Sequence, residues 1–256
     1  MKKFILGLTL LISALFLASC SKALVSNNAS KIVVVGLDDT FAPMGFKNEK
    51  GEIVGFDVDL AKEVFKRLGY EVKFQPIDWA MKESELNSKK IDAIWNGYTI
   101  TEERKEKVDF TKPYLVNRQV IVVLKDSIIN KKSDLEGKRV AAQLNSSSQE
   151  AVEKDKGIVS KFKDGKLNLY ETNNDALMEL ESGRIDAVVV DEILARYYIK
   201  LKGEDKFKIL EDNFGEEEYG IGFRKGDELK DKVDKTLEEM KKDGTFEKIY
   251  SNWFKK

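Results

Sequence analysis

The sequence contains no histidine, a single cysteine and only three prolines among its 256 residues. Without histidine, neither a serine–histidine catalytic triad nor a histidine-ligated metal site can form. One cysteine cannot make an internal disulfide bond or a cysteine zinc cluster. The 44 lysines and arginines nearly balance the 45 aspartates and glutamates, so the chain lacks the basic excess that nucleic-acid binding requires. We therefore expect no nucleic-acid partner.

Glycine-rich phosphate loops are also missing. Gly220-Ile221-Gly222 lacks the third glycine and the following helix pattern of a dinucleotide-binding turn. The acidic cluster at residues 216–218 does not have the spacing of a calcium loop, so we expect it to lie on the solvated surface. No metal ion or other cofactor is therefore expected.

The first residues have the layout of a secretory signal. Two lysines follow Met1, an apolar stretch runs over residues 4–17, and Leu17-Ala18-Ser19-Cys20 comes next. The apolar stretch is short for a membrane span, although an uncleaved anchor is the alternative. The last four residues resemble the bacterial lipobox, in which the cysteine carries the lipid. We therefore expect a signal peptide at 1–19, a tether at 20–30, and an extracytoplasmic protein held to the membrane by lipid on Cys20.

The rest of the chain alternates between strand and helix patterns. The β-branched run at 31–36 and the apolar run at 91–95 indicate buried strands. Apolar residues at helical spacing over 57–68, followed by Gly69, indicate a helix, and residues 226–248 indicate a second, amphipathic one. With 42% hydrophobic residues the chain can build a packed core. This order predicts an α/β fold with largely parallel sheets.

An internal similarity divides the chain. Residues 85–93 (ELNSKKIDA) align with residues 179–187 (ELESGRIDA), and each copy leads from a helix through a turn into an apolar strand. This pattern is common in α/β proteins, so chance similarity is the alternative. We interpret it as two lobes of similar build around a cleft. Because ligands bind at the carboxyl ends of such strands, Asn96-Gly97-Tyr98-Thr99 and Asp191-Glu192 become cleft candidates.

Five segments, in order along the chain, resemble the polar amino-acid solute-binding proteins of ABC importers (bacterial extracellular solute-binding proteins, family 3). They are residues 36–43, 55–61, 91–114, 137–150 and 184–191. The resemblance implies a two-lobed, periplasmic-binding-protein-like (type II) fold with a ligand cleft between the lobes. Lobe 1 would comprise residues 31–117 and 216–256, and lobe 2 residues 118–215, joined by two hinge strands near Asn117 and Gly215.

The resemblance also implies how a free amino acid is bound. Arg104 corresponds to the arginine that binds the ligand carboxylate, and its planar fork suits a bidentate contact. Thr99, Ser146 and Ser147 would add hydroxyl groups, the serines at the start of a helix from Gln149 onward. From the residues alone, the alternative for Arg104 is a surface ion pair with one of its glutamate neighbours, residues 102 and 103.

Asp191 matches the aspartate that binds the ligand ammonium in the family, and the carbonyl of Gly97 would accept from the same group. The alternative for Asp191 is a cap for a helix over 192–201. Further residues lie at or beside positions that line the side-chain pocket in relatives: Asp38, Phe41, Phe46, Trp79, Trp95, Asn96, Gln143 and Ser148. Phe41 and Trp95 have ordinary core packing as their alternative.

This pocket lining is polar with aromatic walls. An aliphatic ligand would leave its polar groups unpaired, so cystine, glutamine or a basic amino acid is favoured. Asn145 stands where many relatives have glycine, and Gly97 stands where some carry a hydroxyl, so the family alone does not identify the ligand.

The expected function is that of a monomeric receptor, not an enzyme, that delivers a polar L-amino acid to a membrane ABC permease. The alternative is a dehydratase-like enzyme on the same scaffold. It would need an acid or base over the ligand, for which Asp38, Asp39 or Glu218 could be offered, but no catalytic pair stands out by spacing. The sensor domain of a kinase or channel would require a further apolar span, and none follows residue 20.

Overall fold

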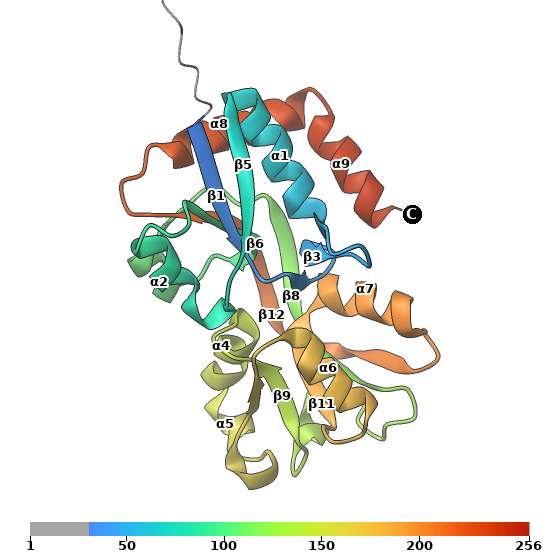
Figure 1. Ribbon diagram of the computed structural model, residues 1–256. Coiled ribbons are helices and arrows are strands. Elements are labelled where there is room, and N and C mark those ends of the chain that lie inside the picture. The colour runs from blue at the N-terminus through green and yellow to red at the C-terminus, as the bar shows by residue number, and fades with distance from the viewer. Residues whose placement is uncertain (1–30, 256) are drawn as a thin grey trace, which may run out of the picture. The chain divides into compact units, whose positions relative to one another are not determined.

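The computed structural model describes residues 31–255, apart from the side chain of Lys156. The predicted signal peptide, tether and Cys20 lie outside these residues. The described residues form two lobes joined by two long strands, which confirms the predicted fold class (Figure 1). One sheet continues through both lobes in the order β10-β9-β11-β8-β12-β6-β1-β5, with β7 beside β12. No helix within 31–255 is long and apolar enough to cross a membrane.

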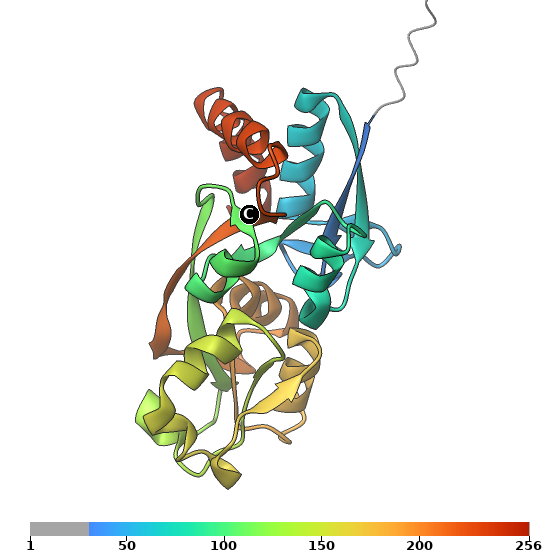
Figure 2. The ribbon, with the colours of Figure 1, turned by 90° about the vertical axis from the view of Figure 1, so that its left-hand side faces the viewer.

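Lobe 1 contains the parallel strands β5, β1 and β6 and a small separate sheet. Its strands are β1 (Lys31–Leu37), β2 (Thr40–Phe41), β3 (Gly45–Lys47), β4 (Ile53–Val54), β5 (Tyr70–Pro76), β6 (Ala93–Thr99) and β7 (Asp109–Phe110). Its helices are α1 (Phe56–Leu68), η1 (Trp79–Met81), α2 (Lys82–Asn87), α3 (Glu102–Lys107), α8 (Leu229–Lys242) and α9 (Thr245–Phe254). The last two helices return to lobe 1 and pack with α1 (Figure 2).

Lobe 2 is built on the parallel strands β10, β9 and β11. Its strands are β9 (Val140–Gln143), β10 (Asn168–Tyr170) and β11 (Ala187–Asp191). Its helices are η2 (Lys132–Leu135), α4 (Ser147–Lys154), α5 (Lys156–Val159), η3 (Lys163–Gly165), α6 (Asn173–Glu181) and α7 (Glu192–Lys202). The carboxyl ends of β9 and β11 are directed toward lobe 1 (Figure 1).

The two connections between the lobes are β8 (Leu115–Leu124) and β12 (Phe207–Phe223), which pair antiparallel with each other. β12 also pairs antiparallel with β6, and β8 pairs antiparallel with β11. Parallel pairing therefore joins β5, β1 and β6 in lobe 1 and β10, β9 and β11 in lobe 2, while the small sheet of lobe 1 is antiparallel. The β8–β12 register is irregular between Ile209 and Asn213 and again between Asn213 and Glu216. Asn117 and Gly215, the predicted lobe boundaries, both lie on these strands. That the lobes divide at these two residues stays a prediction.

Helix α1 forms where the apolar spacing predicts it. Its buried face includes Val58, Leu60, Val64 and Phe65, and Gly69 ends it in the left-handed conformation (φ 74°) that glycine adopts without a steric penalty. The single helix expected over 226–248 is wrong. The chain forms α8 and α9 instead, because Gly244 takes a φ of 79° between them.

The internal similarity has a structural cause. In the first copy, the carboxylate of Asp92 accepts a hydrogen bond of 2.9 Å from the backbone N–H of Val34, on the neighbouring strand β1. In the second copy, Asp186 accepts one of 2.7 Å from the backbone N–H of Arg139, next to strand β9. Each aspartate therefore ties the start of a central strand to its parallel neighbour, and each strand then leads into the cleft.

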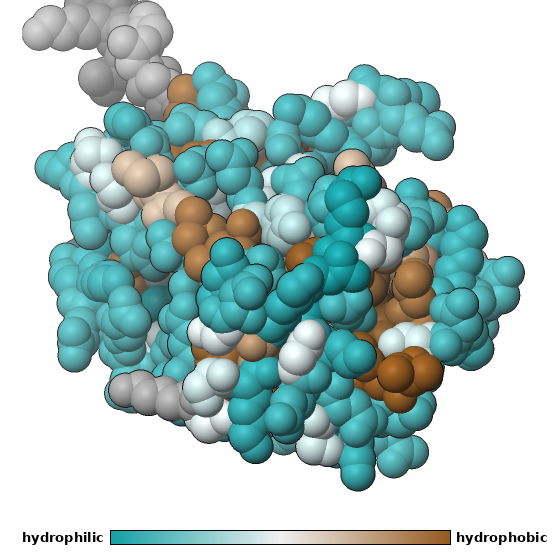
Figure 3. All heavy atoms as spheres, turned by 90° about the horizontal axis from the view of Figure 1, so that it is seen from below, coloured by the Kyte–Doolittle hydropathy of each residue, from teal (hydrophilic) through white to brown (hydrophobic). Residues whose placement is uncertain are grey.

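The surface carries many charges. The face seen from below is mostly hydrophilic, and its hydrophobic side chains lie in separate patches (Figure 3). The most exposed large hydrophobic residues are Val116, Ile128 and Leu201, which come from different parts of the chain. Such scattered apolar side chains are ordinary for a protein surface.

Candidate ligand-binding site

The carboxyl ends of strands from both lobes meet at one small cavity. Ten of the predicted site residues line it: Asp38, Phe41, Trp79, Asn96, Gly97, Arg104, Gln143, Ser146, Ser147 and Asp191. Its volume of about 10 Å³ is close to that of a single water site. The lobes are therefore closed on each other, and a larger ligand can enter only if they move apart.

Arg104 is buried at this cavity, with 5% of its surface exposed. It lies in α3, whose first turn is capped by the side chain of Thr101. Its guanidinium donates to the backbone carbonyl of Thr99 at 3.0 Å and lies 4.8 Å from the centre of the Tyr98 ring. The surface ion pair considered as an alternative is wrong, because glutamates 102 and 103 pair with Lys105 and Lys107. Among residues 31–255, Arg104 makes no ion pair with a carboxylate.

Sequence reasoning missed Lys82, a second cation close by. Only 2% of its surface is exposed, and its ammonium group donates to the carbonyls of Trp79 (3.2 Å) and Asn145 (3.0 Å). Its Nζ lies 3.4 Å from a carboxylate oxygen of Glu83. Burial, and then the charge of Arg104, lowers the pKa of Lys82 to about 8. The pattern of α2 shows no signal for this role, because the burial of Lys82 depends on contact with the other lobe.

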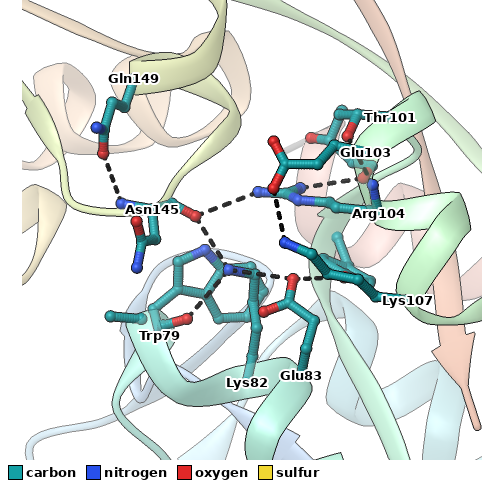
Figure 4. A network of polar contacts seen from close by, with 12 residues as sticks. Trp79, Lys82, Glu83, Thr101, Glu103, Arg104, Lys107, Asn145 and Gln149 are labelled. Atoms are coloured by element: carbon teal, nitrogen blue, oxygen red, sulfur yellow. Dashed lines mark hydrogen bonds and ion pairs between the residues drawn. The ribbon is translucent and has the colours of Figure 1, made fainter.

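The Asn145 carbonyl belongs to the turn between β9 and α4, in lobe 2. Asn145 takes the left-handed conformation (φ 54°), which asparagine adopts more readily than most residues other than glycine. Figure 4 shows Lys82 and Arg104, both from lobe 1, directed at this oxygen. Two cations of one lobe therefore contact one backbone oxygen of the other.

The three serines at the start of α4 have different partners. Ser146 caps the helix by accepting from the backbone N–H of Gln149 at 3.1 Å. Ser147 lies 3.0 Å from the hydroxyl of Thr99, across the cleft. Ser148 is turned away from the cavity and donates to the side-chain carbonyl of Gln119 at 2.5 Å. Ser146 and Ser147 thus line the cavity, and Ser148 does not.

Asp191 ends β11 with 4% of its surface exposed. Its Oδ1 accepts hydrogen bonds from Asn117 Nδ2 (2.7 Å), Gln119 Nε2 (3.2 Å) and the Tyr219 hydroxyl (2.5 Å). Burial first, and then the carboxylate of Glu217, raises the pKa of Asp191 well above its ordinary value. The helix-cap alternative is wrong, because the Asp191 side chain makes no capping bond to α7.

Glu217 corrects the prediction that residues 216–218 are solvated surface. Its Oε1 accepts from Thr99 Oγ1 (2.9 Å), Asn117 Nδ2 (2.8 Å) and Gln119 Nε2 (2.7 Å). Glu216 and Glu218 are exposed as predicted. The three residues lie on β12, where successive side chains alternate between faces, so the middle one is directed at the cleft. If a strand had been assigned to residues 216–218, the alternation of its side chains would have indicated that Glu217 faces the cleft.

At the other end of the cavity, Asp38 is buried and hydrogen-bonded from both lobes. It accepts from the hydroxyl of Thr40 (2.7 Å) in lobe 1 and from Gln143 Nε2 (2.8 Å) in lobe 2. Its backbone N–H donates to Asn96 Oδ1 at 3.0 Å. Burial raises the pKa of Asp38. The carboxylate of Asp38 is therefore directed into the cavity.

Thr99 contacts Ser147 and Glu217 beside the cavity without lining it, and three other predicted residues also lie outside the lining. Trp95 is in the core of lobe 1, against Phe65 and Tyr114, as its alternative proposed. The Tyr98 ring lies beneath the guanidinium of Arg104 and thus supports the site from behind. Phe46 contacts Tyr197 and Trp253 at a separate surface groove, with ring centroids 5.8 and 6.1 Å away, because β3 directs it away from the strand ends.

Gly97 brings the strand end close to the aromatic wall. Its φ is 57°, and a Cβ at this position would lie 2.8 Å from Cε1 of Phe41. Its backbone N–H donates to the buried carboxylate of Asp57 at 2.7 Å, which also accepts from the Tyr114 hydroxyl at 2.9 Å. Burial raises the pKa of Asp57 to about 7.

The ligand cleft lies between two lobes that two strands connect. This arrangement defines a type II periplasmic-binding-like protein. Residues 33–256 match the sequence model of the bacterial extracellular solute-binding proteins, family 3, and the chain belongs to this family. The resemblance inferred from the five segments is confirmed.

Particular relatives cover nearly the whole chain. The arginine-binding extracellular protein ArtP of Bacillus subtilis (strain 168) is 36% identical over 256 residues, which are 99% of this chain and 98% of that protein. A solved substrate-binding protein of an ABC uptake transporter from Streptococcus pneumoniae, with bound histidine, is 38% identical, with a TM-score of 0.86 over 88% of this chain and 93% of that one. An ancestral arginine-binding protein bound to arginine is 47% identical, with a TM-score of 0.80 over 87% and 98% of the two chains.

Proposed function

We propose that this protein is an extracytoplasmic receptor that binds one free L-amino acid and delivers it to an ABC importer. The observation that carries the proposal is the placement of Arg104 and Asp191 at one closed cavity between the lobes. A zwitterion buried there needs a cation for its carboxylate and an anion for its ammonium. Arg104 has no carboxylate partner among the described residues, and Asp191 has no cation. ArtP and the solved relatives support the same assignment.

In this proposal Arg104 holds the ligand carboxylate in a bidentate contact, with the hydroxyls of Thr99 and Ser147 beside it. Asp191 and Glu217 accept from the ammonium group. Phe41 and Trp79 flank the side chain, which extends toward Asp38. Lobe closure then follows from the ligand's contacts with both lobes, as a shift in population and not a chemical step.

The charges around the cavity favour a basic ligand. Asp38, Asp191 and Glu217 supply three carboxylates, whereas Arg104 is the cation that lines the cavity itself. A neutral amino acid would bring no net charge into this acidic surrounding, but arginine, lysine or ornithine would bring one positive charge. A guanidinium or ammonium at the end of the side chain would also give Asp38 an ionic partner. We therefore rank basic amino acids above glutamine and cystine.

A screen of ligand-induced thermal shift tests this function. The ligands are the twenty L-amino acids, cystine and ornithine, each at several concentrations, because stabilisation grows with concentration over the dissociation constant. We expect arginine, lysine or ornithine to give the largest shift. Largest shifts from leucine, isoleucine or valine would contradict the polar pocket, and no shift from any of them would contradict the receptor function. Mass spectrometry after long incubation separates binding from turnover, since a changed product would favour the enzyme alternative.

We also propose that a lipid on Cys20 anchors the receptor, because the lone cysteine follows an apolar stretch at the position that a lipobox requires. Cys20→Ala should then release or misprocess the protein when cells are fractionated. A variant that is processed normally and remains with the membrane would contradict the lipid anchor and leave the ligand assignment untouched.

A further inference from the structure

We infer that Asp191 and Glu217 form one proton-sharing carboxylate pair, and that the ammonium group of an arriving amino acid displaces the shared proton. This inference rests on the proposed function. It makes ligand capture at the two carboxylates of the ammonium site a proton-releasing event. The proton leaves to solvent, the ligand ammonium keeps its own three protons, and no covalent bond changes.

The geometry joins the two carboxylates through common donors. The side-chain nitrogen of Asn117 lies 2.7 Å from Asp191 Oδ1 and 2.8 Å from Glu217 Oε1. The side-chain nitrogen of Gln119 lies 3.2 Å and 2.7 Å from the same two oxygens. Two oxygens that share two donors lie near each other, although they come from β11 and β12. The arrangement of the crossing strands therefore holds the two oxygens close together.

The hydrogen-bond partners of this pair are neutral, although Arg104 and Asp38 line the same cavity as Asp191. β8 contributes the amides of Asn117 and Gln119, β6 and α4 contribute hydroxyls, and β12 contributes Tyr219. The titratable groups behind Tyr219 are Tyr114, whose ring centroid is 6.4 Å away, and Asp57, to which Tyr114 donates. Arg104 donates instead to backbone carbonyls. Within residues 31–255, neither Asp191 nor Glu217 makes an ion pair.

Asp191 is buried and Glu217 is partly buried. Two such carboxylates with no cation bonded to them do not both stay ionised, since burial and mutual repulsion favour the protonated form. Such a pair takes up protons as a unit, so the proton belongs to both residues. The raised pKa of Asp191, caused by burial and by Glu217, agrees with this arrangement. A ligand ammonium supplies the same compensating charge with three N–H donors, and it can contact both carboxylates at once. The proton and the ammonium therefore compete for one place.

Isothermal titration calorimetry counts the protons directly. The probe is L-arginine at pH 6, titrated in phosphate and again in imidazole, two buffers with different heats of ionisation. At this pH the arginine ammonium is fully protonated before and after binding, so a released proton comes from the protein. We expect close to one proton per arginine bound, and an affinity that rises by up to about tenfold per pH unit until the pair is ionised.

Glu217→Gln keeps the shape and an acceptor oxygen but removes the second carboxylate. We expect its proton release to fall toward zero and its affinity to become nearly independent of pH. Glu216→Gln is the matched control, because that side chain is exposed on the same strand. It should behave as the wild type does, and circular dichroism checks that both variants fold.

The outcomes separate the two proposals. Arginine binding without proton release in the wild type would overturn the carboxylate pair and leave the receptor function standing. Equal proton release in wild type and Glu217→Gln would also overturn it, because another group, such as Asp38, would then be the source. If no amino acid bound at all, the proposed function would itself be wrong.

Discussion

The ammonium group of Lys82 in lobe 1 donates a 3.0 Å hydrogen bond to the backbone carbonyl of Asn145 in lobe 2. The guanidinium of Arg104 reaches the same oxygen at 3.4 Å. A backbone carbonyl cannot be removed by side-chain mutation, so the donors on lobe 1 control this contact. Lys82 lies beside the ligand cavity without lining it, which separates its effect on closure from direct contact with ligand.

We predict that Lys82→Met speeds ligand dissociation. The variant keeps an unbranched apolar stem but loses a charged hydrogen bond between the lobes, a bond worth about 1.5–3 kcal/mol. The dissociation rate should rise by roughly tenfold or more, with a smaller change in the association rate. Stopped-flow fluorescence measures both rates. Lys105→Met, an exposed lysine of the same lobe, is the control, and an unchanged rate for Lys82→Met would show that the contact does not hold the lobes closed.

Arg104→Ala should abolish measurable binding. The ligand carboxylate would be buried without its charged partner, at a cost of about 3–5 kcal/mol, or at least a hundredfold in affinity. Arg104→Lys keeps the charge but not the planar fork, so its loss should be intermediate. Calorimetry measures the affinities, and thermal unfolding without ligand checks the fold. An affinity for Arg104→Ala within threefold of wild type would show that the carboxylate binds elsewhere.

The buried carboxyl of Asp57 should make stability depend on pH. Its pKa is about 7 in the folded protein against an ordinary value of 3.8, so between these values the folded state binds the extra proton. The free energy of unfolding from this group therefore falls as the pH rises from about 4 to about 7, and stays level above that. As the pH rises across this window, the free energy of unfolding of Asp57→Asn should increase by on the order of 3 kcal/mol relative to that of the wild type.

Urea unfolding at pH 4.5 and pH 8 tests this prediction. The quantity compared is the difference in unfolding free energy between Asp57→Asn and wild type at each pH, because other carboxyl groups contribute equally to both proteins. Asp126→Asn, at an exposed position, serves as the control. The prediction fails if the difference is the same at the two pH values.

Substituting Gly97 should lower the stability by more than the backbone strain of its positive φ alone would. Gly51 also has a positive φ (77°), but a Cβ there has no atom within 4 Å, whereas at Gly97 it lies 2.8 Å from Phe41. Gly51→Ala should therefore lose about 1–2 kcal/mol of stability from backbone strain. Gly97→Ala should lose more and also weaken ligand binding, because Phe41 must move. Equal losses of stability, with ligand affinity intact, would argue against this close approach.

Residues at the ends of strands could be placed from the sequence. Arg104 and Asp191 come after or at the end of apolar strands, one in each lobe, and the carboxyl ends of both strands face the cleft. The aspartates of the internal similarity are visible because each makes the same local bond to a neighbouring strand. That these residues bind ligand stays a prediction, but their convergence on one cavity is what the strand pattern indicated.

Other residues depend on contacts that the local pattern does not contain. Lys82 is buried only because the turn at Asn145 lies against it. The orientation of Glu217 depends on the register of a strand that the pattern did not reveal. Phe46 lies in a short strand whose pairing directs it away from the cavity. For Lys82 and Glu217 the partner is far away in sequence, and no periodicity reports it.

β12 is the last strand of the chain, yet it lies in the middle of the sheet, between β8 and β6. As the polypeptide is synthesised, the other strands of the sheet are complete by residue 191, before the strand that joins the two halves begins at residue 207. Until residue 223 has emerged, β6 and β8 each present an unpaired edge, which is where chains aggregate or are cleaved. A nascent chain of this protein therefore depends on protection of these edges during its final residues, and a truncated product that ends before β12 would be a preferred target for proteolysis.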